Sequence, residues 1–148
     1  MKGLLIFMFS LGAFWDFATS FLGIVGIFGL TKIEFTVEST VVFITAVIGS
    51  GIILGLGLNT EKLWEKDPDE EFYKWLRPFH VVAIFFDAYT SFLGTAQNII
   101  LRNTQTSFIT IGIEEVLENT TVQQQLTLLF LTITVTISPI MMAKLSEK

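Results

Sequence analysis

The segment FWDFATSFLG at residues 14–23 returns as FFDAYTSFLG at residues 85–94. Seven of the ten positions are identical, and the two copies are separated by a constant offset of 71 residues. Chance explains such agreement poorly, even in a chain of biased composition, so we interpret it as an internal duplication. The duplication predicts two related halves, residues 1–66 and residues 72–148.

The composition around this repeat is that of a membrane protein. Of the 148 residues, 51% are hydrophobic and only 16% are charged, whereas soluble domains average about 25% charged residues. The chain has no cysteine, which excludes disulfides, thiolate metal sites and cysteine nucleophiles. A soluble enzyme, a nucleic-acid-binding module and a secreted disulfide scaffold are therefore all disfavoured.

Four apolar stretches match the length of about 20 residues that a helix needs to cross the hydrocarbon core. They lie at about residues 4–30, 39–59, 79–101 and 124–143. Hydroxyl residues from Thr132 to Ser138 alternate with aliphatic ones, which is strand periodicity. Lipid overrides this signal, because each spanning segment must satisfy its own backbone hydrogen bonds. We therefore predict one transmembrane domain, residues 1–148, with four helices.

The offset of the repeat fixes the expected topology. It contains two membrane crossings, so both copies enter the membrane from the same side. The predicted fold is an all-α integral membrane four-helix bundle built from two parallel helical-hairpin repeats. Seven of the nine Lys and Arg residues fall in the N-terminus, the middle loop and the C-terminal tail. This excess predicts that both termini are cytoplasmic.

The middle loop contains a helix-start pattern. Asp67 is a capping residue, Pro68 suits the first helical position, and Glu70 follows at the third. We therefore expect a short amphipathic cytoplasmic helix between the repeats, running from Pro68 toward Arg77 and ending before Pro78. Its aromatic residues predict an anchor at the headgroup level, with docking of a partner as the alternative.

Each copy of the repeated motif places one carboxylate inside a spanning segment. An Asp at the centre of a membrane helix costs about 2.5–3.5 kcal/mol on insertion scales. Hydroxyl residues follow each Asp at i+3 and i+4, on the same helix face. They are Thr19 and Ser20 after Asp16, and Thr90 and Ser91 after Asp87. The repeat predicts that the two carboxylates lie at similar depth around the symmetry axis.

The faces beyond the motif differ between the halves. On the third helix polar residues continue from Gly94 to Gln97, Asn98 and Arg102, which suits a water-filled cavity or a polar seam. The first and second helices instead carry glycines, which allow close helix packing. These predicted helix-packing residues are Gly23, Gly26, Gly29, Gly51 and Gly55.

Carboxylate and hydroxyl oxygens suit a proton or a hard cation. If the two carboxylates lie close together, one of them is expected to hold a proton at neutral pH. The predicted binding or pore-lining residues are Asp16, Thr19, Ser20, Asp87, Thr90, Ser91, Gln97 and Asn98. Two other interpretations stay open: the polar residues serve only to join the helices, or they recognise a partner.

Enzymatic chemistry has little support. His80 is the single histidine, and its position predicts a polar residue at the cytoplasmic interface. No metal cluster, nucleophile elbow or phosphate-binding loop is present in the sequence. We therefore expect no enzyme activity, no cofactor and no metal.

The functional prediction is a small polytopic membrane protein whose copies self-associate in the lipid bilayer. The homo-oligomer would form an ion- or small-solute-conducting or binding site lined by the intramembrane carboxylates. The alternatives are a non-transporting accessory or assembly subunit of a larger membrane complex, and a membrane-permeabilising effector. No nucleic-acid partner is expected.

Overall fold

The computed structural model describes residues 2–28, 30, 35–65, 71–101 and 112–146. Within these ranges the chain contains helices and no strand. The elements are α1 (Lys2–Ile27), α2 (Val37–Leu58), α3 (Thr60–Leu63), α4 (Glu71–Thr95), a π-helical segment η1 (Ala96–Leu101), α5 (Ile113–Glu118) and α6 (Val122–Ser146). The all-helical prediction is confirmed for the described residues.

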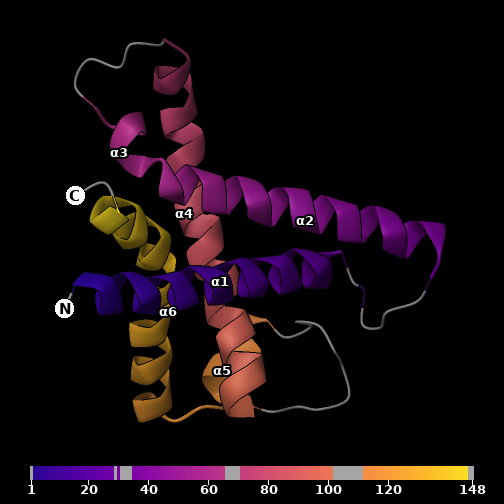
Figure 1. Ribbon diagram of the computed structural model, residues 1–148. Coiled ribbons are helices and arrows are strands. Elements are labelled where there is room, and N and C mark those ends of the chain that lie inside the picture. The colour runs from indigo at the N-terminus through magenta and orange to yellow at the C-terminus, as the bar shows by residue number, and fades with distance from the viewer. Residues whose placement is uncertain (1, 29, 31–34, 66–70, 102–111, 147–148) are drawn as a thin grey trace.

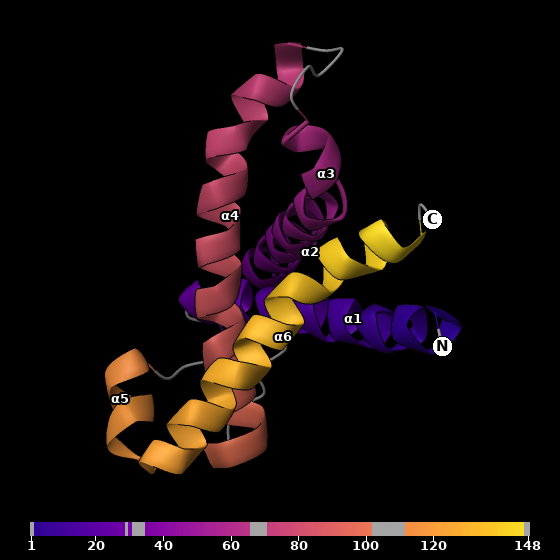
Figure 2. The same ribbon diagram turned by 90° about the vertical axis from the view of Figure 1, so that its left-hand side faces the viewer.

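Four of these helices, α1, α2, α4 and α6, are long and apolar enough to cross a membrane by length and composition. They correspond to the four apolar stretches of the sequence. The alternating hydroxyl residues lie inside α6, so the strand-like pattern does not produce a strand. Helix α6 continues through Pro139 to Ser146, and both views show it curving along its length (Figures 1 and 2).

Helix α1 is the centre of the arrangement, because it contacts α2, α4 and α6. Figure 1 shows α1 and α2 as one antiparallel hairpin and α4 and α6 as another. The two hairpins cross steeply, and Figure 2 shows the same crossing from the side. The start of α1, the end of α6 and helix α3 lie on one side of the crossing (Figure 1). Helix α5 and the connection between α1 and α2 lie on the other side.

The expected separate helix from Pro68 to Arg77 is a wrong prediction. Helix α4 begins at Glu71 and runs without a break through Pro78 to Thr95, while residues 66–70 lie outside the described ranges. Pro78 removes the hydrogen bond to the carbonyl of Lys74. Both residues are exposed, so that carbonyl can be hydrated instead. The short helix that precedes α4 is α3, which the sequence analysis did not predict.

Two apolar clusters lie on either side of the α1–α4 crossing. One joins α1 to α2 through the buried residues Ile24, Val25, Val42 and Ala46. The other joins α4 and η1 to α5 and α6, with Leu93, Ala96 and Leu128 packed around Val116. Val116 is fully buried, so α5 caps this end of the bundle, as the apolar character of the outer loop suggested.

Close helix contacts use a different set of glycines from the predicted one. A Cβ on Gly23 would clash with the Thr90 side chain, and one on Gly57 would lie 3.1 Å from the Pro139 Cβ. Of the predicted packing residues, Gly51 and Gly55 have no other heavy atom within 4 Å of a Cβ built there, because they face outward from α2. Gly29 lies outside the described residues.

We expect Gly23→Ala to lower the free energy of unfolding by about 1–3 kcal/mol, because the new methyl group overpacks the contact with Thr90. The matched control is Gly51→Ala, which adds the same methyl group in open space and should change stability by about 1 kcal/mol or less. Unfolding in detergent, followed by circular dichroism, measures both. Equal effects would contradict the described crossing.

Candidate functional site

The two copies of the repeated motif face each other where α1 crosses α4. Six of their polar residues are buried, each with at most 3% of its surface exposed. They are Asp16, Thr19 and Ser20 from α1, and Asp87, Thr90 and Ser91 from α4. Their spacing of three and four residues puts each set on one helix face, as predicted from the sequence. We call these six residues the polar cluster.

Hydrogen bonds of the polar cluster join the two helices reciprocally. Ser20 Oγ on α1 donates to Asp87 Oδ1 on α4. Its counterpart at an offset of 71 residues, Ser91 Oγ, donates to Asp16 Oδ1 at 3.3 Å. Each carboxyl is therefore bonded by a serine from the other half of the chain. The sequence analysis placed the hydroxyls beside the carboxylates but did not identify this exchange.

The threonines repeat the same exchange. Thr19 Oγ1 lies 2.8 Å from Ser91 Oγ, and Thr90 Oγ1 lies 3.3 Å from Ser20 Oγ. Each threonine hydroxyl also bonds the carbonyl of the Asp three residues earlier, at 3.1 Å in both helices. Since each threonine hydroxyl can spend its hydrogen on its own helix, the serines supply the hydrogens that cross between the halves.

The carboxyl groups of Asp16 and Asp87 lie close enough to share a hydrogen bond. Both line a closed cavity of about 10 Å³, which is room for roughly one water molecule. Most of its other lining residues are apolar, and no Lys or Arg of the described chain lines it. The Thr136 hydroxyl of α6 lies near Asp87 in this cavity without forming a well-aligned hydrogen bond.

This arrangement limits what the site can hold. Two adjacent carboxyl groups in an apolar, closed cavity can bind one proton between them or one small cation through their oxygens. The cavity is too small for an organic solute. Among the described residues, no group of three or more His, Cys, Asp and Glu side chains is arranged to hold a metal ion.

The predicted polar stripe on the third helix reaches Gln97 and then ends. Gln97 is buried with 6% of its surface exposed, but Asn98 is exposed and its amide bonds the carbonyl of Gly94 at 2.7 Å. Asn98 is thus not part of the polar cluster. The π-helical turn at Ala96–Leu101 explains the difference, because it changes the helical period and rotates later residues away from the stripe. Arg102 lies outside the described residues.

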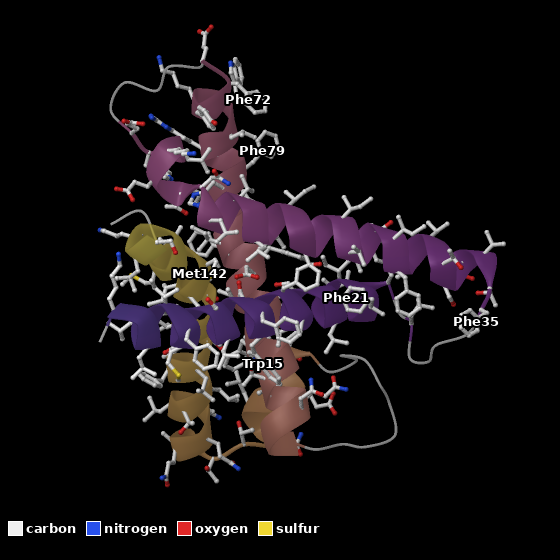
Figure 3. The ribbon with its side chains drawn as sticks, viewed as in Figure 1. Trp15, Phe21, Phe35, Phe72, Phe79 and Met142 are labelled. Atoms are coloured by element: carbon white, nitrogen blue, oxygen red, sulfur yellow. The ribbon has the colours of Figure 1, made fainter. Side chains whose placement is uncertain are left out.

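Trp15 and Thr95 add a contact that the sequence analysis did not anticipate. Trp15 Nε1 on α1 donates to Thr95 Oγ1 on α4 at 3.5 Å, and Figure 3 shows the Trp15 ring at the crossing of the two helices. In the other half, Phe86 occupies the position that corresponds to Trp15 and packs on the cluster that contains Ile24. The crossing is therefore symmetric at its polar centre and differs between the halves around it.

His80 is the functional residue that sequence reasoning misplaced. It was expected at the membrane interface, but only 2% of its surface is exposed, and it lines the same cavity as the two carboxyls. Its Nδ1 accepts a hydrogen bond from Trp64 Nε1 at 3.1 Å, and its Nε2 lies 2.9 Å from Thr60 Oγ1. Both partners come from the turn around α3, which no pattern in the sequence indicated.

No known protein family, curated protein or solved structure matches the chain. The chemistry of the site is therefore argued from its residues and their geometry alone.

Proposed function

We propose that the chain is an integral membrane protein with four spanning helices, arranged as two hairpin repeats of the same orientation. The four long helices contain between 22 and 26 residues. They are therefore roughly 33–39 Å long, which exceeds the hydrocarbon thickness of about 30 Å. Helices of this length can cross the bilayer when tilted by up to about 40°. The steep crossing of the hairpins in Figure 1 is compatible with such tilts.

The shared direction of the repeats is supported by the way the helices run. An axis that bisects α1 and α4 in Figure 1 has these two helices running one way and α2 and α6 running the other way. The reciprocal serine–carboxyl bonds are what a two-fold relation between α1 and α4 produces. With this axis as the membrane normal, both termini and α3 face one side, which the distribution of Lys and Arg assigns to the cytoplasm.

We further propose that the Asp16–Asp87 pair binds an exchangeable proton or small cation within the membrane and takes part in its transfer across the bilayer. The observation that carries this proposal is the pairing of two buried carboxyls in one cavity that no Lys or Arg of the described chain lines. Their burial is costly. Serine and threonine hydroxyls on the same faces already join the helices, so helix joining alone does not require the acids.

Transfer requires more than one closed chain. The cavity at the carboxyl pair has a volume of about 10 Å³, and four helices enclose little space. We propose that copies of the chain assemble into a homo-oligomer, in which the arrangement of the hairpins opens a path to the pair. The outward-facing glycines of α2, Gly51 and Gly55, lie on a surface that suits close packing with another helix.

Proton flux into liposomes tests the carboxyl pair directly. We expect the purified protein to acidify vesicles that contain a pH-sensitive dye, and Asp16→Asn or Asp87→Asn to reduce the flux to that of protein-free vesicles. Asn keeps the oxygen that accepts the bond from Ser91 or Ser20, so the fold is retained while the proton-binding group is lost. Glu114→Gln removes an exposed acid on α5 and should leave the flux unchanged.

Flux that persists in both Asn variants, with the variants folded as judged by circular dichroism, would contradict the proposal. It would favour the interpretation in which the polar cluster only joins the helices. The same vesicles with a potassium or sodium gradient distinguish a proton from a small metal cation as the transferred species.

The mass of the detergent-solubilised particle tests the homo-oligomer. We expect a particle that contains several copies of the 16.6 kDa chain, measured by light scattering with the detergent contribution subtracted. A lone monomer would contradict the assembly. Recovery only together with other membrane proteins would instead support an accessory subunit.

A further inference from the structure

A second, larger pocket lies next to the carboxyl cavity. It has a volume of about 640 Å³, is open to the surface, and lies between the end of α2, helix α3 and the end of α6. Its charged lining residues are Glu61, Lys62, Glu65 and Lys144. It therefore opens on the side of the molecule where α3 and the chain's C-terminus lie (Figure 2).

The wall between this pocket and the carboxyl cavity is thin. Gly57 and Ile140 line both spaces. Gly57 has no side chain to fill the boundary, and a Cβ at this position would already lie 3.1 Å from the Pro139 Cβ. A path from the surface to Asp16 and Asp87 therefore needs only a small displacement at the level of these residues.

His80 stands at the same boundary and ties α3 to α4. Because Trp64 Nε1 donates to its Nδ1, the neutral ring carries its hydrogen on Nε2 and donates it to Thr60 Oγ1. Thr60 in turn donates to the carbonyl of Gly57 at 2.8 Å. His80 lines the inner cavity, whereas Thr60 and Trp64 line the outer pocket. This chain of bonds joins the two spaces through one buried ring.

Arg77 fastens the same segment from the outside. Its Nε and Nη2 donate to the carbonyls of Leu63 and Glu65 at 2.7 and 2.8 Å. Its guanidinium also lies 5.5 Å from the centre of the Trp64 ring. Helix α3 is thus held against α4 at two levels, with the inner level at His80 facing the cavity.

We infer that the α2–α3–α6 pocket is the aqueous entrance to the Asp16–Asp87 pair, and that His80 holds the passage closed through its bonds to Thr60 and Trp64. This inference rests on the proposed function and adds the side of access and the residue that controls it. A proton enters the pocket as hydronium, is transferred to a carboxylate oxygen of the pair, and leaves a water molecule behind.

The absence of cysteine from the sequence allows the entrance to be blocked at one defined position. Ala143→Cys places a thiol in the pocket, and Val122→Cys places one on the exposed first turn of the same helix, α6. Both variants are reacted with a bulky sulfonated maleimide and reconstituted into liposomes. We expect the maleimide to abolish proton flux in the Ala143 variant and to leave the Val122 variant unchanged.

Carbodiimide labelling tests the role of His80 independently of flux. Dicyclohexylcarbodiimide reacts with protonated carboxyls, and mass spectrometry locates the adduct on Asp16 or Asp87. We expect His80→Ala to increase the labelling rate several-fold, and Trp64→Phe, which keeps an aromatic ring beside Arg77 but removes the N–H donor, to increase it in the same direction. Maleimide on Ala143→Cys should suppress labelling in all of these backgrounds.

The outcomes separate this inference from the proposed function. If the wild-type protein conducts protons and the maleimide on Ala143→Cys leaves flux and labelling unchanged, the entrance is wrong while the proposed function stands. If His80→Ala and Trp64→Phe both label at the wild-type rate, His80 does not close the passage. If the wild-type protein shows neither flux nor labelling, the proposed function is wrong and the entrance is rejected with it.

Discussion

Two carboxyl groups buried in a chain of apolar helices must find hydrogen-bond partners inside the molecule. Neither helix meets this need alone, because the serine beside each Asp donates to the Asp of the other half. The pairing holds α1 and α4 together at one level and requires close contact there. Gly23, which leaves room for Thr90, meets that requirement. The steep crossing of the hairpins and the closed cavity follow from this one constraint.

The duplication gives a symmetric centre and an asymmetric periphery. The reciprocal bonds of the polar cluster repeat at the offset of 71 residues, but the surrounding contacts do not. Trp15 bonds Thr95, whereas its counterpart Phe86 packs against aliphatic residues. Helix α3 lies between the halves and therefore occurs once in the described chain. A passage closed by α3 and His80 consequently gives access to the carboxyl pair from one side only.

The sequence predicted the features that local spacing determines. The four apolar helices follow from length and hydropathy, and the burial of both motif copies follows from the duplicated Asp, Thr and Ser residues. The partners across the crossing could not be read from it, since a helix period places Ser20 beside Asp16 and contains no information about Asp87. His80 was misplaced for the same reason, because its partners Thr60 and Trp64 depend on how α3 folds back on α4. Gly51 and Gly55 were expected to pack within the chain, but a small residue in a sequence does not indicate which face is covered.

The central claim is that α1 and α4 cross at the repeated motif and bring the two carboxyls together. Disulfide formation in native membranes tests it most directly, using Thr19→Cys with Ser91→Cys in the cysteine-free chain. Their side-chain oxygens lie 2.8 Å apart, so we expect rapid and nearly complete intramolecular cross-linking under mild oxidation. The control pair is Phe14→Cys with Phe85→Cys, which is also related by the repeat offset but is exposed on both helices. Absence of the 19–91 cross-link, or equal intramolecular cross-linking of the control pair, would contradict the crossing and the carboxyl pair that it creates.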